Sequence, residues 1–155
     1  MCAARRRDRV RPQLKRRSVP VAYKSLFCVL TDPALVQSSV AHAEALAIQM
    51  DAHLEVLCFG VDRTQTGYYY AGANSVVIQE TLARATAEAE LLNKQARAQL
   101  DGSMARWSVQ HGVAQLADIG RHVAGHARFC DLTVLPKPYG ESHGAELEPV
   151  IEGAL

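Results

Sequence analysis

Short apolar runs of strand length alternate with amphipathic helical segments along this 155-residue chain, and this alternation constrains the fold more than any other feature. Three of the runs are almost continuously apolar, which is typical of strands buried on both faces. They are 25–31, 54–59 (ending at Gly60) and 132–135. A fourth run, 105–110, alternates between apolar and polar residues, as a strand at a sheet edge does. Strands that alternate with helices imply right-handed crossovers, so we predict an open, parallel, Rossmann-like α/β sheet with helices on both faces.

The segments between the runs have helical periodicity and recognisable helix ends. Asp32 and Pro33 supply an N-cap and a first helical residue directly after the first strand. Asp101 and Gly102 close the longest apolar stripe, whose residues recur three or four positions apart. The four predicted helices cover about 33–50, 75–100, 116–127 and 146–155.

Charge divides the chain into two parts. Residues 1–24 hold nine Lys/Arg and one acid, a net charge of +8, whereas 25–155 carry a net charge of −7. We expect 1–21 to be a disordered basic tail, because its charges repel and it lacks periodicity, and 22–155 to be one domain. The tail is an extension from an upstream start, an arm that binds polyanions or a transit peptide, and these interpretations stay open. The acidic domain argues against a specific nucleic-acid surface, and no apolar run is long enough to span a membrane.

Ligands of an open parallel sheet bind beyond the carboxyl ends of its strands, where the strand order reverses. Asp32 leaves the first strand at this edge, and two compatible roles are open for it: a hydrogen bond to a ribose hydroxyl, or a plain N-cap. Lys137 and Arg63 follow two other strands and are candidates to face a phosphate, with exposed side chains of no ligand role as the alternative. The Tyr- and Gly-rich segment 67–72 is either an aromatic lid over a ligand or partner, or a loop whose rings pack on the sheet edge.

Other patterns of reactive side chains point away from catalysis. His122 and His126 have a spacing that can hold a metal on a helix, but no third ligand accompanies them, so we predict solvated histidines and no metal site. Cys28, Cys58 and Cys130 lie in or beside apolar runs and have no zinc spacing, so we expect buried, reduced thiols, which fits a cytoplasmic protein. Nucleophile-elbow and phosphate-loop motifs do not occur in the sequence. We therefore expect no enzymatic activity.

From Tyr23 onward, the sequence resembles a universal stress protein domain of the UspA type. The similar pieces are SLFCVLTDPA, AHLEVLCF, QETLARATAEAELL, the glycine Gly112 at the end of the third predicted strand, and DLTVLP, and they spread over about 23–155. The resemblance implies the family's five-stranded parallel sheet of order 3-2-1-4-5, an adenine-nucleotide alpha hydrolase-like fold, and a usual dimeric state.

The resemblance also implies a ligand site. ATP-binding members of the family use the acid after strand one, backbone near the end of strand two and a glycine motif after strand four. By position these become Asp32, Gly60 and Leu135, and we add Lys137 as the cation closest to that loop in sequence.

The glycine motif of the ATP-binding members does not carry over to this chain. Pro136 takes the place of the first glycine, and Gly140 and Gly144 have a different spacing. Proline has no N–H to offer a phosphate, so the backbone donors that such a loop builds are reduced. We therefore expect weak or absent ATP binding, and the non-ATP-binding branch of the family is the closer likeness.

The sequence ends where the family would add its fifth strand. We therefore expect four strands, an unpaired edge on the fourth, and a fragment of a longer or tandem protein. The expected partners are a second copy in a homodimer, a second universal stress domain or another protein. The expected function is that of a cytoplasmic stress-response protein that binds a small ligand or a protein partner without catalysis. The alternative hypothesis is a nucleotide-binding module that holds ATP around Asp32. The third hypothesis is a nucleotide hydrolase or an adenylyl-type enzyme.

Overall fold

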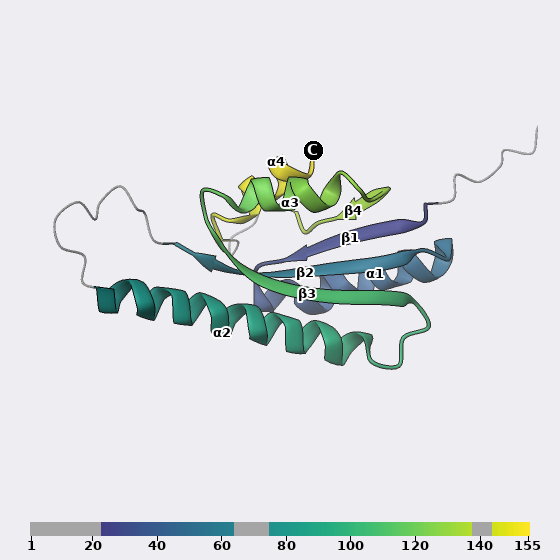
Figure 1. Ribbon diagram of the computed structural model, residues 1–155. Coiled ribbons are helices and arrows are strands. Elements are labelled where there is room, and N and C mark those ends of the chain that lie inside the picture. Colours follow the sequence, from purple (N-terminus) through teal and green to yellow (C-terminus); the bar gives the residue numbers. More distant parts are fainter. Residues whose placement is uncertain (1–22, 64–74, 138–143) are drawn as a thin grey trace, which may run out of the picture.

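The computed structural model describes residues 23–63, 75–137 and 144–155, so the expectations for the basic tail and for the segment 67–72 lie outside the described residues. Helices cover both faces of one sheet (Figure 1). The strands are β1 (Ser25–Leu30), β2 (His53–Asp62), β3 (Arg106–Gln115) and β4 (Leu132–Val134). The helices are η1 (Pro33–Leu35), α1 (Val36–Met50), α2 (Ser75–Leu100), α3 (Ile119–Ala127) and α4 (Leu147–Ala154).

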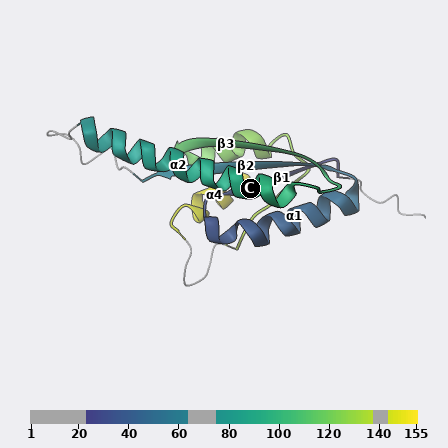
Figure 2. The ribbon, with the colours of Figure 1, turned by 90° about the horizontal axis from the view of Figure 1, so that it is seen from below.

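The strands form one parallel sheet of order β3-β2-β1-β4. Helices α1 and α2 lie side by side against one face, as the view from below shows (Figure 2), and α3 and α4 cover the other face. This arrangement confirms the predicted open α/β, Rossmann-like fold with four parallel strands.

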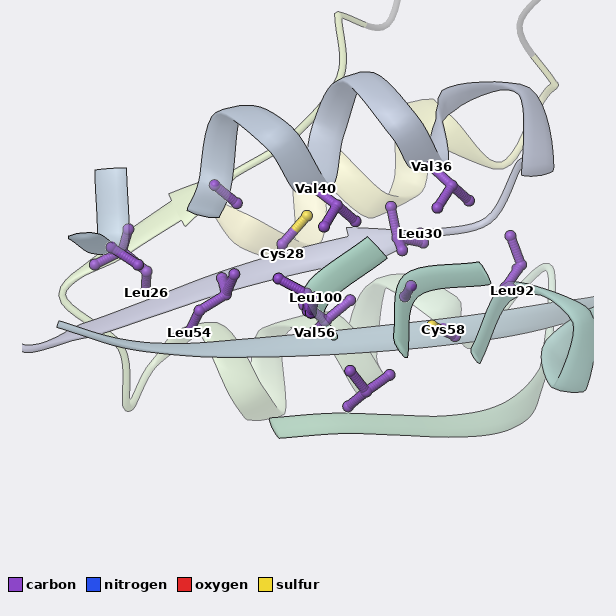
Figure 3. Close-up of a cluster of buried hydrophobic side chains, with 14 of the residues drawn as sticks. Leu26, Cys28, Leu30, Val36, Val40, Leu54, Val56, Cys58, Leu92 and Leu100 are labelled. Carbon is purple, nitrogen blue, oxygen red and sulfur yellow. The ribbon is translucent and has the colours of Figure 1, made fainter. Parts of the chain in front are cut away.

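The larger core lies between the sheet and the α1–α2 layer. Alternate residues of β1 and β2 point into it, and Leu92, Ala96 and Leu100 of α2 close it (Figure 3). The strand side chains of this core are Leu26, Cys28, Leu30, Leu54, Val56 and Cys58. Helix α2 ends at Leu100, and Gly102 has a φ of 78°, the left-handed conformation that favours glycine after a helix.

The second core lies on the opposite face, under α3 and α4. Phe27 and Val29 of β1 pack there against Ile119, Val123 and Val150. Strand β1 is thus buried on both faces, which is why its sequence reads as a continuous apolar run instead of alternating.

Strands β2 and β3 are longer than the sequence predicts. They pair residue by residue from His53 with Arg106 to Asp62 with Gln115, so each spans ten residues. The prediction that the second strand ends at Gly60 is therefore wrong, and Gly112 also lies inside its strand. Tertiary pairing carries the ladder through both glycines, although glycine alone favours a strand end. The predicted edge position of the third strand is confirmed, because β3 pairs with β2 alone in the described part of the chain.

Strand β4 forms the other edge of the sheet. Among the described residues it pairs with β1 only, in register from Leu26 with Leu132 to Cys28 with Val134. All three of its residues are partly exposed. The expected open edge on the fourth strand is confirmed within the described ranges.

Candidate functional site

The strand order reverses between β1 and β4. The chain leaves β1 through α1 towards β2, and it later crosses from β3 through α3 to β4 on the other side of β1. Helix α1, which follows β1, and helix α4, which follows β4, lie on opposite faces of the sheet, so a crevice at the carboxyl ends of these two strands is the expected ligand position in an open α/β sheet. Asp32 follows β1 there, and Leu135 and Lys137 follow β4.

Asp32 is the N-cap of η1. Its Oδ1 accepts a hydrogen bond of 2.8 Å from the backbone N–H of Ala34, and its own carbonyl accepts one of 3.1 Å from Leu35. The capping role predicted from the sequence is therefore confirmed. The ribose-binding role of Asp32 stays a prediction. It is compatible with the capping role, because capping uses only one of the two carboxylate oxygens.

Thr31 precedes Asp32 and is more than nine-tenths buried. Its hydroxyl oxygen has no hydrogen-bond partner within the ranges 23–63, 75–137 and 144–155. A buried hydroxyl without a partner costs about 1–3 kcal/mol. A hydrogen bond to the Thr31 hydroxyl from an atom outside the described residues would remove this penalty.

An ion pair between a buried carboxylate and a half-exposed guanidinium lies at the same edge of the sheet. The Glu146 side chain at the start of α4 is only 5% exposed, and its Oε1 accepts a 2.8 Å hydrogen bond from Arg63 Nη2. Arg63 follows β2, and its Nη1 is 3.6 Å from Glu88 on α2. Arg63 thus pairs with two carboxylates, one from each helix layer. This pairing argues against the phosphate-facing role that the sequence left open for Arg63.

The Glu146 carboxylate folds back over the segment that precedes α4. A Cβ on Gly144 would overlap its carboxyl carbon and both oxygens. The N-terminus of a helix attracts anions, because its free N–H groups and its dipole favour negative charge. In this chain a carboxylate of the protein itself is buried at the start of α4. Sequence analysis missed Glu146, because its partner Arg63 is 83 residues away along the chain.

The remaining candidate residues are Gly60, Leu135 and Lys137. Gly60 lies two residues before the end of β2 and faces α2, where a Cβ would come 2.6 Å from the carbonyl carbon of Ala85. Position 60 therefore needs a glycine because α2 packs closely against β2 there. Leu135 and Lys137 line a hollow of about 300 Å³ between β4 and α1.

His126 is partly buried and packs on the sheet, so the prediction that it is solvated is wrong, whereas His122 is exposed, as predicted. His126 stacks on Phe27, with ring centroids 5.6 Å apart, and its Nδ1 donates a 3.0 Å hydrogen bond to Glu55 Oε1. His122 lies against Phe59, with centroids 5.9 Å apart. In the described part of the chain, no three metal-ligating side chains come together.

Two cysteines behave as apolar core residues, as predicted. Burial, together with the nearby Cys58, raises the pKa of Cys28 to about 12. Burial likewise raises the pKa of Cys58 to about 12, although Arg97 acts in the opposite direction. Both thiols are therefore protonated at neutral pH and are poor nucleophiles.

Comparison with solved structures finds a similar fold in a universal stress protein. The universal stress protein UspA from Lactobacillus plantarum is 19% identical, with a TM-score of 0.64 over 85% of this chain and 92% of that one. A universal stress protein from Archaeoglobus fulgidus is 12% identical, with a TM-score of 0.46 over 83% of this chain and 90% of that one. No family model and no curated protein matches the sequence. At these identities the likeness is one of fold.

No helix in the described ranges combines the length and the apolar character that crossing a membrane requires.

Proposed function

We propose that this chain is a universal stress protein-like stress-response protein that acts by binding a small ligand or a protein partner, without catalysis and without holding ATP. The fold that it shares with universal stress proteins supports the family assignment. The observation that carries the ligand part of the proposal is the buried Glu146 carboxylate at the start of α4, bonded to Arg63.

Charge repulsion would oppose a nucleotide at this position. Two unit negative charges about 4 Å apart repel by roughly 4 kcal/mol in the partly screened surroundings of a protein surface, and about 1.4 kcal/mol is a tenfold change in affinity. Arg63 is shared between Glu146 and Glu88, so one cation faces two carboxylates and a phosphate near Glu146 would still meet net negative charge. Pro136, which has no N–H, removes one backbone donor that would offset this repulsion.

A small ligand without phosphate fits the crevice better. The half-buried Asp32 lies at its edge, and Thr31 beside it has a buried hydroxyl without a described partner. A carboxylate and a hydroxyl suit the hydroxyl and amino groups of a neutral ligand.

The second candidate function is an ATP-binding module. The position of Asp32 favours it, directly after β1 at the reversal of strand order. In that case, ATP binding would depend on the Asp32 carboxylate, and the negative charge of Glu146 would not weaken it.

Thermal denaturation with adenosine and with Mg-ATP, at equal millimolar concentrations, separates the two functions. Our proposal predicts that ATP raises Tm no more than adenosine does, because the triphosphate adds only repulsion. A rise of several degrees with ATP alone, lost in Asp32→Ala, would favour the ATP module. Release of phosphate from ATP above the rate without protein would contradict the non-catalytic part of the proposal.

A further inference from the structure

Helix α2 has a second face with apolar residues, and this face lies in solvent. The buried stripe of α2, from Ala85 to Leu100, packs on the sheet. On the opposite side of the helix, residues three or four positions apart are all exposed in the described part of the chain. They are Val76, Glu80, Ala83, Ala87, Leu91, Lys94 and Ala98, which we call the outer face of α2. Figure 2 shows α2 on the outside of the sheet, and Leu91 is 46% exposed there.

The outer face also contains a position where a leucine of a facing helix can fit. Glu80, Ala83, Arg84 and Ala87 are residues i, i+3, i+4 and i+7, the four positions that form a hole for a side chain of a facing helix. Two of the four are alanines, so the middle of this hole is open. If two copies of α2 pack antiparallel with a two-fold axis at Ala87, Leu91 of each copy lies four residues from the axis, level with this hole in the other copy.

The charges of the outer face fit the same pairing. Glu80 and Lys94 lie seven residues before and after Ala87, about 10 Å along the helix in either direction. Glu80 of one copy is therefore level with Lys94 of the other, twice by symmetry. Exposed ion pairs add little affinity, but opposite charges at matching levels fix the register of two helices. Long-range repulsion between two copies is small, because the formal net charge of the full chain is +1.

The same pairing brings the exposed start of α2 against α1 of the second copy. The Gln99 side chain, near the end of α2, donates a 3.0 Å hydrogen bond to the Gln37 carbonyl, so the start of α1 lies beside the end of α2. Val77 is 41% exposed and lies on the same side of α2 as Gln99, because the two are about six helical turns apart. In an antiparallel pair, Val77 of one copy therefore comes beside the start of α1 in the other. Helix α1 suits this contact, because Glu44 is its one charged residue.

We propose that two copies of this chain pair antiparallel through the outer face of α2, with Leu91 of each copy seated between Ala83 and Ala87 of the other. A second copy fits this face better than an unrelated protein does, because the leucine, its hole and both opposite charges lie on one face and match each other about one axis. The pairing involves neither edge of the sheet. The inference goes beyond the proposed function, because it concerns assembly and does not depend on what the crevice beside Asp32 binds.

Sedimentation equilibrium of the full chain, from about 1 to about 200 µM, measures this association. We expect a reversible monomer–dimer equilibrium with a micromolar Kd, because one helix face is a small interface. Leu91→Lys should raise Kd by about tenfold or more, because it places a charge in the centre of the contact. Leu82→Lys is the matched control: Leu82 lies on the same helix and is 50% exposed, but it belongs to the stripe on the sheet side. It should leave Kd within about twofold of the wild type, and circular dichroism checks that both variants are folded.

Exchange of the two charges tests the antiparallel register. Glu80→Lys and Lys94→Glu should each weaken the dimer by about three- to tenfold, because each change turns two attractions into repulsions. The double variant Glu80→Lys/Lys94→Glu should return Kd to within about threefold of the wild type. A chain that stays monomeric up to about 200 µM would overturn the proposal and leave the outer face of α2 to a different protein. A dimer that Leu91→Lys leaves unchanged, or a double variant weaker than both single ones, would overturn it as well.

Discussion

Gly60→Ala should be among the most destabilising single-methyl changes in this chain. The added Cβ would come 2.6 Å from the carbonyl carbon of Ala85 and 3.1 Å from the nitrogen of Ala89, both of them backbone atoms of α2. Ordinary contacts begin near 3.4 Å, so α2 must move away from β2 by on the order of 1 Å. That movement would loosen the packing of a helix stripe whose residues Ala85 and Ala89 are buried. Overpacking of this kind costs about 1–3 kcal/mol and occasionally more, and we expect about 3 kcal/mol here because backbone must shift.

Gly125→Ala is the matched control for this variant. Gly125 lies inside α3, and a Cβ there would meet no atom within 4 Å, so alanine should stabilise the helix by about 0.5–1 kcal/mol. Equilibrium urea denaturation of the two variants measures both effects on the free energy of unfolding. A Gly60→Ala protein within 0.5 kcal/mol of the wild type would refute the close approach of α2 to β2. A loss in Gly125→Ala as large as that in Gly60→Ala would refute the reasoning as well.

Three further predictions concern caps and thiols. Asp32→Ala should cost about 1 kcal/mol of stability by removing the cap of η1, measured as a fall in Tm, while Asp32→Asn should keep most of it. Hydrogen bonds from Lys24 and Ser25 lower the pKa of Asp131 below its usual 3.8, so the stability that its carboxylate contributes is present above pH 3.8 and is lost as the pH falls through the folded-state value. Asp131→Asn should therefore destabilise the protein at pH 7, and this effect should shrink as the pH falls below 3.8. Site-resolved mass spectrometry should find Cys28 and Cys58 unlabelled by iodoacetamide at pH 8 in the folded protein and labelled in urea.

The fold could be predicted from the sequence because its strongest signals are local and mutually consistent. The apolar run of β1, the stripe of α2 and the cap at Asp32 each determine one element without help from the rest of the chain. The lengths of β2 and β3 could not be predicted in the same way. Their ladder continues through Gly60 and Gly112 because each strand supports the other, and such pairing is a tertiary effect.

The candidate site was predicted less completely than the fold. The position of Asp32 follows from the order of strands, but the ion pair between Arg63 and Glu146 joins residues that no sequence periodicity relates. His126 did leave a signal, because it lies four and seven residues after His122 and Ile119, on the side of α3 that faces the sheet. A histidine on a buried stripe should have been predicted to contact the sheet.

Calorimetric titration with Mg-ATP, on the wild type, Glu146→Gln and Asp32→Ala, tests the central claim most directly. We predict a dissociation constant in the high-micromolar range or weaker for the wild type. Glu146→Gln should bind at least tenfold more tightly, because it removes the buried negative charge while keeping the shape of the side chain. A low-micromolar constant in the wild type, unchanged in Glu146→Gln and abolished in Asp32→Ala, would contradict the account and establish the ATP-binding module instead.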